Sequence, residues 1–194
     1  NLPVTYDEVT NLPERELSDL CYAISKGTGR QVLNQDGTAK ELDNNWQTMM
    51  ISTSNSSLHS RLSLAKADAS AEAVRVFEFY VPSGTIPKQQ ADATLDLLND
   101  HYGLAGAPFM HFVVQHQAKV KERVHHWMRE VEKRAGVTSG ERFWSAAPAA
   151  VLAATEITNT MKLTSFDIQG LFAFVVKAIN SMRGNVESTT ATPL

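Results

Sequence analysis

The side chains best placed to do chemistry stand near the amino end, where Asp7 and Glu8 directly follow the short apolar run at residues 2–6. Such a run predicts a β-strand that delivers two adjacent carboxylates to its C-terminal end. One carboxylate there can hold a magnesium ion, and its neighbour can polarise a water molecule that attacks a phosphate. We therefore expect Asp7 to bind Mg²⁺ and Glu8 to activate water. The alternative is that the pair merely caps a following helix.

The other half of a nucleotide site is missing from the sequence. No phosphate-binding loop of the form Gly-x-x-x-x-Gly-Lys-Ser/Thr occurs in the 194 residues, and the first residue is Asn1 rather than Met. The run Gly27-Thr28-Gly29 is no substitute, because it follows a predicted helix and lacks the lysine and hydroxyl ending. We expect the chain to be the C-terminal part of a larger ATP-dependent motor protein.

The composition limits the partners and the cellular location that are compatible with this chemistry. The net charge of −3 gives no global basic surface, so a nucleic-acid binder of this kind must concentrate its cations locally. The single cysteine excludes a disulfide framework and a four-cysteine zinc site, which favours a reducing, cytoplasmic location. No apolar run of about 18 residues argues for insertion into a membrane.

The first 85 residues predict a mixed α/β region. Pro13 and Glu14 suit the first turn of a helix that Gly27 ends, and Asp36-Gly37 predicts the turn of a β-hairpin. The expected elements after the first strand are a helix to residue 26, a hairpin at 29–42, a strand at 46–53, a weak helix at 56–72 and a strand at 74–81.

The pattern becomes helical after a predicted boundary near residue 85. Apolar residues recur at helical spacing in four segments, which are 89–101, 109–134, 141–158 and 165–182. The predicted fold class is therefore α/β followed by all-α. A helical lid domain would span residues 86–183, and the small polar residues 184–194 predict a disordered tail.

The order of these elements resembles that of AAA+ ATPases. In those proteins the strand that carries the acidic pair is followed by a helix and then by a second strand, which ends in a polar residue that orients the attacking water. Asn55 stands at that place. A third strand is preceded by an arginine that reaches the nucleotide of the neighbouring subunit. Arg75 begins the third predicted strand, and Arg61 lies on the helix before it.

Several segments make the resemblance more specific. The chain resembles the DUF927 family of phage and mobile-element primase-helicases, in which a helix and a basic glycine-rich run precede a Trp-containing strand that ends in Ser-Thr-Gly. The segments that carry the resemblance are residues 22–30, Trp46, Ile51-Ser52-Thr53, residues 72–76 and Arg142-Phe143. It is close over the first 80 residues and looser up to residue 180. The chain departs from the family at Ser54-Asn55, where many members carry Gly-Glu.

The resemblance implies an AAA+ or RecA-like P-loop ATPase that assembles as a ring, here without its Walker A loop. It implies ATP and Mg²⁺ as cofactors, DNA as a partner and a hexameric homo-oligomer that acts as a helicase in replication of a phage or mobile element. Its hairpin before the sensor strand would project into the ring and follow the DNA backbone, with Lys26, Arg30 and Lys40 as phosphate contacts. An ordinary surface hairpin is the competing interpretation.

Two further alternatives stay open at this point. Arg142 begins a predicted helix and could contact the terminal phosphate of ATP, or it could be a solvated arginine at a helix start. The whole chain could also be a non-catalytic DNA-binding or assembly module that is derived from such a motor.

Overall fold

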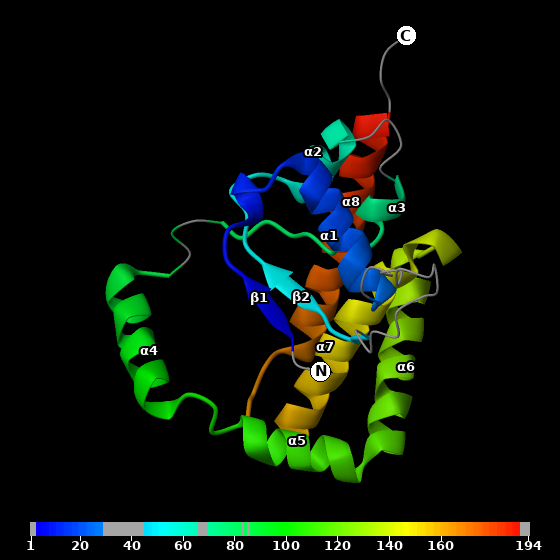
Figure 1. Ribbon diagram of the computed structural model, residues 1–194. Helices are drawn as coiled ribbons and strands as arrows, with labels where there is room; N and C mark the ends of the chain where they lie inside the picture. The colour runs from blue at the N-terminus through cyan, green and yellow to red at the C-terminus, as the bar shows by residue number, and fades with distance from the viewer. Residues whose placement is uncertain (1–2, 29–44, 66–69, 83, 85, 191–194) are drawn as a thin grey trace, which may run out of the picture. The chain divides into compact units, whose positions relative to one another are not determined.

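The computed structural model describes two compact units within residues 3–28, 45–65, 70–82, 84 and 86–190 (Figure 1). One unit comprises residues Asn1–Glu78 with Ser181–Leu194, and the other comprises Phe79–Asn180. The first contains a small parallel sheet and short helices, and the second is helical. The broad prediction of an α/β region followed by helices is therefore confirmed. The predicted hairpin at 29–42 lies outside the described residues.

Within the described part of the first unit, the sheet consists of two parallel strands. β1, Val4–Tyr6, pairs with β2, Met50–Ser52, with Val4 opposite Met50 and Tyr6 opposite Ser52 (Figure 1). Parallel pairing places the C-terminal ends of both strands at one edge. The acidic pair after β1 and the polar residues after β2 are therefore neighbours.

A turn and a helix follow β1. The turn is a single 3-10 turn, η1, Val9–Asn11, which precedes α1, Glu14–Lys26. As predicted, α1 begins after Pro13 with acidic residues in its first turn and ends at Gly27, which has φ 71°. A side chain at residue 27 would also collide with the Trp46 carbonyl oxygen, because the added Cβ would lie 2.5 Å away.

Two short helices complete the core of the first unit. α2, Leu58–Ala65, and α3, Ser70–Ala73, both contact α1. The side chains of this core are fully or almost fully buried, and they are Val9, Leu17, Ser18, His59, Leu62, Glu72, Ala73 and Met182. Buried Glu72 accepts a hydrogen bond of 2.9 Å from the Ser18 hydroxyl, which satisfies one polar atom inside this core.

The predicted strand at 74–81 is wrong. Residues 76–82 belong to no helix or strand, and residues 70–73 before them are helical. The backbone here is bonded by side chains instead of by a neighbouring strand. The Val76 carbonyl lies 3.2 Å from His59 Nε2, and the Glu78 amide donates to Met182 Sδ at 3.1 Å. An alternating pattern predicts a strand only where a partner backbone is present.

The described residues of the second unit form five helices and one 3-10 turn. Their bounds are α4 Lys88–His101, α5 Gly106–Gln115, α6 Gln117–Ala135, η2 Ser139–Glu141, α7 Arg142–Thr160 and the start of α8 Ile168–Thr190. α8 passes through Gly184 into residues for which the sequence predicts a disordered tail. A single glycine costs a helix only about 1 kcal/mol, so it does not have to end one.

The predicted helix at 109–134 is divided into α5 and α6. The break lies at His116, whose φ of −122° and ψ of 36° are not helical. Its amide still donates to the Phe112 carbonyl at 2.9 Å, and its carbonyl accepts from the Val120 amide at 2.9 Å. The break therefore leaves these backbone groups hydrogen-bonded. The apolar spacing used to predict the helix runs across residue 116 and so does not reveal the break.

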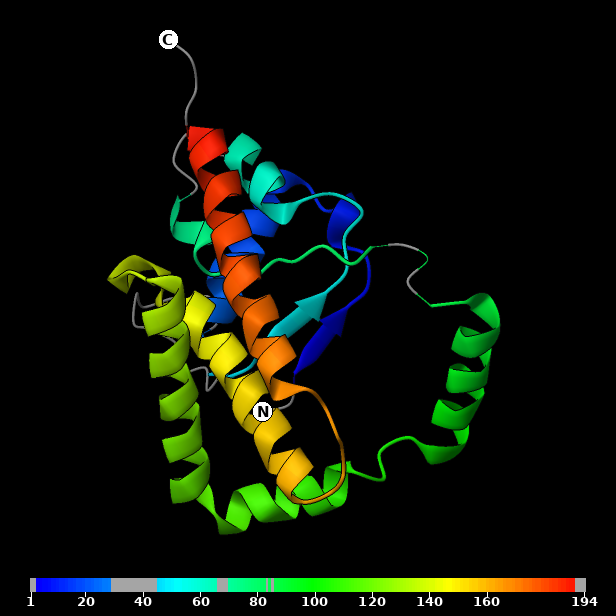
Figure 2. The same cartoon turned by 180° about the vertical axis from the view of Figure 1, so that it is seen from behind.

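α6 and α7 lie side by side and form the core of the helical unit (Figure 2). The buried apolar side chains of this unit come from α6, α7 and α8, and they are Trp127, Val131, Ala135, Trp144, Ala149, Leu152, Ala153, Ile157, Val175, Ala178 and Ile179. Among the described residues, no helix combines the length and the apolar character that crossing a membrane requires.

Candidate functional site

The acidic pair lies where the two parallel strands end. Asp7 follows β1 and Thr53 follows β2, and the Thr53 hydroxyl donates to Asp7 Oδ1 at 2.7 Å. The same hydroxyl accepts a hydrogen bond of 2.9 Å from the Glu8 amide. One threonine side chain therefore binds both acidic residues. The site is open, because Asp7 and Glu8 are exposed.

Asn55 reaches the second carboxylate from the neighbouring strand end. Its Nδ2 donates to Glu8 Oε1 at 2.8 Å, and its backbone amide donates to the Thr10 hydroxyl at 2.9 Å. Glu8 has φ 56° and ψ 75°, a left-handed conformation that costs free energy for a residue with a side chain. Such outliers concentrate at functional sites. The structure thus brings Asp7, Glu8 and Asn55 together, as the sequence predicts.

Arg61 lies behind this edge and binds the turn that follows Glu8. Its Nη1 donates to the Val9 carbonyl at 2.9 Å, and its Nη2 donates to the Leu12 carbonyl. Glu14 is 3.6 Å from the same guanidinium, and the Arg61 side chain is only 11% exposed. The contacts of Arg61 are therefore internal to the unit, and in this structure it supports η1.

Arg75, the other arginine considered for a role between subunits, is attached to α1. Its Nε donates to the Ser25 hydroxyl at 2.9 Å, its Nη1 donates to the Ala71 carbonyl, and its guanidinium lies 4.6 Å from the centre of the Tyr22 ring. Arg75 therefore packs against residues in the C-terminal half of α1. A guanidinium held in this way presents its charge from a fixed position.

Cys21 lies on α1, and its side chain is a protonated thiol rather than a nucleophilic thiolate. Burial, reinforced by the charge of Glu72, raises its pKa to about 11, although Arg75 acts in the opposite direction. A cysteine with so high a pKa holds little thiolate at neutral pH. This chemistry fits a small, partly buried side chain on α1.

Sequence reasoning missed two residues that organise the site. Thr53 is one, and its signal in the sequence is a hydroxyl at the last position of the strand predicted at 46–53. Glu78 is the other, and its carboxylate caps α2, accepting hydrogen bonds from the Ser57 hydroxyl at 3.2 Å and from the Leu58 amide at 3.1 Å. A carboxylate at a helix N-terminus is favourable. It also fixes the start of α2, a few residues after Asn55.

The cations predicted to bind DNA are only partly described. Lys26 is exposed in the last turn of α1, whereas Arg30 and Lys40 lie outside the described residues. The described residues on either side of that segment meet, because Thr28 and Asn45 form an antiparallel bridge. The Trp46 amide also donates to the Gly27 carbonyl at 2.8 Å. The chain thus returns to the end of α1 before it enters β2.

Arg142 belongs to the helical unit, whereas Asp7 and Glu8 belong to the other unit. It is the first residue of α7, and its guanidinium lies 5.2 Å from the centre of the Phe143 ring. The turn before it is closed by Thr138, which exchanges hydrogen bonds with Glu141. These contacts explain how Arg142 is held at the start of α7 without a bound ligand.

The donor set at the strand edge suits a hard cation. Asp7 offers a carboxylate beside the Thr53 hydroxyl, and Mg²⁺ prefers oxygen ligands from one or two carboxylates together with phosphate oxygens and water. No group of three or more His, Cys, Asp or Glu that could enclose a metal occurs among the described residues. The described residues at this edge therefore offer oxygen donors but do not enclose a metal ion by themselves.

Comparisons with protein families, with curated proteins and with solved structures find no match for this chain.

Proposed function

We propose that this chain is the C-terminal part of the ATPase domain of a DNA motor of the DUF927 type. One observation carries the proposal. Asp7, Glu8 and Asn55 meet at the shared edge of two parallel strands, and the Asn55 amide donates to the Glu8 carboxylate at 2.8 Å. Ligand sites of parallel sheets are located at the carboxyl ends of the strands. An acidic pair with a polar neighbour at that edge is the arrangement that nucleotide hydrolysis needs.

Each residue has a distinct role in the proposed reaction. Bound Mg²⁺ would neutralise charge on the phosphates, and Asp7 is the carboxylate that would hold it. Glu8 accepts the proton of the attacking water, and the Asn55 amide orients the Glu8 carboxylate toward that water. Thr53 supports both acids through its hydroxyl. The phosphate-binding loop is absent from the 194 residues, and the proposal assigns it to polypeptide outside them.

The exposed surface of the sheet supports a larger parent domain. All of β1 is exposed, and the apolar side chains Val4, Tyr6 and Ile51 are 46%, 42% and 55% exposed. A two-stranded sheet is marginal in water, and apolar strands are normally covered by further strands or helices. Additional strands of an ATPase core would cover these residues.

The nucleotide would lie between subunits of a ring, and the DNA would lie in the channel of that ring. Arg75, which α1 holds through Ser25, is the residue that would act on the nucleotide of a neighbouring subunit. Arg61 instead supports η1 within its own unit. Lys26, with Arg30 and Lys40, would contact DNA phosphates, and six copies would multiply these few cations into a binding channel.

Glu8→Gln in the parent motor tests the assignment. We expect ATP binding to be retained and turnover to fall at least about 100-fold, because a general base contributes about two to four orders of magnitude. Glu16→Gln, an exposed residue on α1, is the matched control and should keep full turnover. Equal turnover in Glu8→Gln and the control would refute the proposed role.

The isolated chain provides a second test. Without a phosphate-binding loop, we expect the 194 residues to show no magnesium-dependent ATP turnover above background. A coupled phosphate-release assay measures it. Turnover that depends on Glu8 in this chain alone would contradict the view that the phosphate cradle lies elsewhere.

The alternative function is that of an assembly module, and one observation favours it. Every residue of α4 is exposed, although the helix carries three leucines. An assembly module would bind its partner equally well with Glu8→Gln and would show no nucleotide turnover in any parent chain. The two functions are therefore separated by the same variant.

A further inference from the structure

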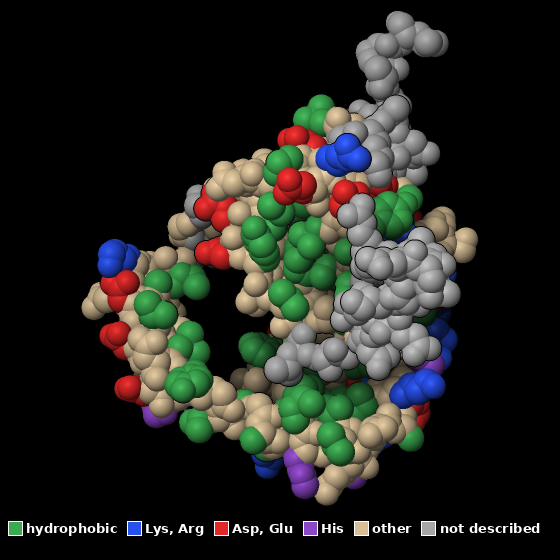
Figure 3. All heavy atoms as spheres, viewed as in Figure 1, with side chains coloured by type: hydrophobic (Ala, Val, Ile, Leu, Met, Phe, Trp, Pro, Cys, Tyr) green, Lys and Arg blue, Asp and Glu red, His purple; other side chains and the backbone are tan. Residues whose placement is uncertain are grey.

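The loop that carries Asn55 to the acidic pair has no apolar anchor of its own. Residues 53–57 read Thr-Ser-Asn-Ser-Ser, so all five are polar, and none of them is buried. In Figure 3 the edge where both strands end shows acidic side chains and uncharged atoms, whereas apolar side chains lie over the strands. A loop without buried apolar side chains is positioned by its hydrogen bonds and by the elements at its two ends. These elements are β2 on one side and α2 on the other.

Hydrogen bonds join this loop to the turn that follows β1. The Thr10 hydroxyl lies 3.3 Å from the Ser54 hydroxyl and accepts from the Asn55 amide at 2.9 Å. Ser54 in turn donates to the Ser56 carbonyl at 2.8 Å. The loop is therefore one connected group, and a displacement at Ser56 would also move Asn55.

The end of the loop that enters α2 is held by Glu78. Its Oε1 accepts from the Leu58 amide at 3.1 Å, and its Oε2 accepts from the His59 amide and the Ser57 hydroxyl, each at 3.2 Å. Amides at the start of a helix have no partner within the helix. The Ser57 hydroxyl accepts from the Ser60 amide at 3.2 Å, so the first three amides of α2 are all bonded. Two of these three bonds depend on Glu78.

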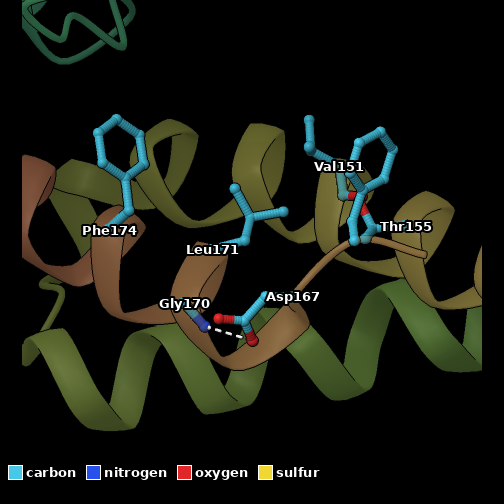
Figure 4. A pocket seen from close by; sticks show the side chains of 7 residues that line it. Val151, Thr155, Asp167, Gly170, Leu171 and Phe174 are labelled. Atoms are coloured by element: carbon cyan, nitrogen blue, oxygen red, sulfur yellow. Dashed lines mark hydrogen bonds between the residues drawn. The ribbon is translucent and has the colours of Figure 1, made fainter. Parts of the chain in front are cut away.

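The cap of α8 shows how unusual this contact is. The Asp167 carboxylate accepts from the Gly170 amide at 3.0 Å, only three residues along the chain (Figure 4). That bond holds the start of its own helix and nothing else. Glu78 instead caps α2 from 20 residues away in the sequence. Its own amide donates to Met182 Sδ at 3.1 Å, so the carboxylate ties the start of α2 to a segment that is itself held in place.

We propose that Glu78 is a positioning residue of the candidate site, which holds the start of α2 so that Asn55 reaches Glu8. It acts on the Glu8 carboxylate through the loop at 53–57. For the reaction, this inference rests on the proposed function, in which Asn55 orients the Glu8 carboxylate. The placement of Asn55 by Glu78 is measurable without nucleotide.

Amide hydrogen exchange of the 194-residue chain, followed residue by residue by NMR, tests this placement. The reporters are the amides of Glu8 and Asn55, which donate to the hydroxyls of Thr53 and Thr10. In Glu78→Ala we expect both amides to exchange at least about tenfold faster, because the loop loses its hold on α2. Exchange inside α1 should change by less than about threefold.

Three results would overturn the proposal. Faster exchange confined to Leu58 and His59 would make Glu78 a cap of α2 and nothing more. Equally faster exchange throughout the first unit would reflect a general loss of stability. Unchanged exchange at Glu8 and Asn55 would show that the loop holds its place without Glu78.

Ser18→Ala is the matched control for stability. It removes a buried hydrogen bond of 2.9 Å in the same unit and leaves the contacts of the loop intact. Relative to exchange inside α1, exchange at Glu8 and Asn55 should be as in the wild type. A response equal to that of Glu78→Ala would contradict a specific role for Glu78.

Glu78→Gln provides a second variant of similar size. It keeps one acceptor oxygen for three donors, so exchange at Glu8 and Asn55 should lie between that of the wild type and that of Glu78→Ala. Where Glu78→Ala does not fold, this variant decides the question. Wild-type exchange rates in Glu78→Gln would then overturn the proposal.

The parent motor connects this placement to turnover. Glu78→Ala should lower kcat for ATP at least about tenfold and change KM less than about twofold, because Asn55 acts on the general base rather than on nucleotide binding. A raised KM with unchanged kcat would contradict the positioning role. If Glu8→Gln keeps full turnover while exchange responds to Glu78→Ala, the proposed function fails and the placement stands. If Glu8→Gln abolishes turnover and exchange does not respond, the placement fails and the proposed function stands.

Discussion

Glu8 and Glu156 accept similar hydrogen bonds in two different settings. Glu8 is exposed in the sheet unit and accepts one side-chain donor, Asn55. Glu156 lies on α7 in the helical unit and accepts two hydrogen bonds from Arg123, at 3.0 and 2.7 Å, and one of 2.8 Å from Trp127 Nε1. The first carboxylate is accessible to a ligand, whereas the second is held by its own chain.

The two settings separate a carboxylate that is open to solvent from one that is held by its own chain. Burial acts to raise the pKa of Glu156, but the hydrogen bonds from Arg123 and Trp127 outweigh burial and place its pKa below the ordinary value. Such a group is stabilised as an anion by the fold. Around Glu8, by contrast, the fold uses a left-handed backbone and a neighbouring threonine to present the carboxylate.

The largest effect is expected in the core of the helical unit, to which Glu156 also belongs. Trp144→Ala removes a side chain that is 2% exposed, and the free energy of unfolding should fall by about 3–5 kcal/mol. Urea unfolding followed by circular dichroism measures it. Tyr80→Ala is the control, because that side chain is 81% exposed and should change stability by less than about 0.5 kcal/mol.

Arg61→Ala should have the next largest effect. The Val9 and Leu12 carbonyls would lose their donor in a partly buried setting, which costs about 2 kcal/mol. Urea unfolding of the wild-type and Arg61→Ala chains, followed by circular dichroism, measures the loss. Arg15→Ala, on the exposed side of α1, should be neutral. A neutral Arg61→Ala would remove the evidence that this arginine supports the turn.

Glu156→Gln should cost about 1 kcal/mol near neutral pH, a modest value because the ion pair with Arg123 is partly exposed. The pKa of Glu156 is lower in the folded state than in the unfolded state. The contribution of Glu156 to the free energy of unfolding is therefore present above the ordinary pKa of a glutamate. It is lost as the pH falls through the lowered pKa of Glu156 in the folded state. Urea unfolding at neutral and strongly acidic pH should show the wild-type advantage disappear. Exposed Glu122→Gln should show no such advantage at either pH.

The smallest effect on stability is expected for Glu8→Gln. The exposed amide oxygen of Gln can still accept from Asn55, so the free energy of unfolding should change by less than about 0.5 kcal/mol. Thermal unfolding of the two chains measures it. A loss of more than 1 kcal/mol would make Glu8 a structural residue like Glu156, and the contrast between the two units would fail.

Helix positions were largely predictable, because their signals are local. Pro13 and Gly27 mark the ends of α1 in the sequence and in the structure. The apolar spacing of residues 89–101 predicts a helix that differs from α4 by one residue. The adjacency of Asp7, Glu8 and Asn55 was also predictable, since it requires only that two strands be parallel neighbours. What an acidic pair does once it is positioned remains a proposal.

Features that depend on distant partners were decided only by the tertiary structure. Residues 76–82 have a strand pattern, but His59 and Met182 bond their backbone, so no strand forms. Arg61 binds carbonyls about 50 residues away in the chain, at a distance that no periodicity encodes. The sequence by itself therefore determined most of the helices and which residues stand at the strand ends. Partners that are close only in space decided which extended run joins the sheet and which charged side chains stay open to a ligand.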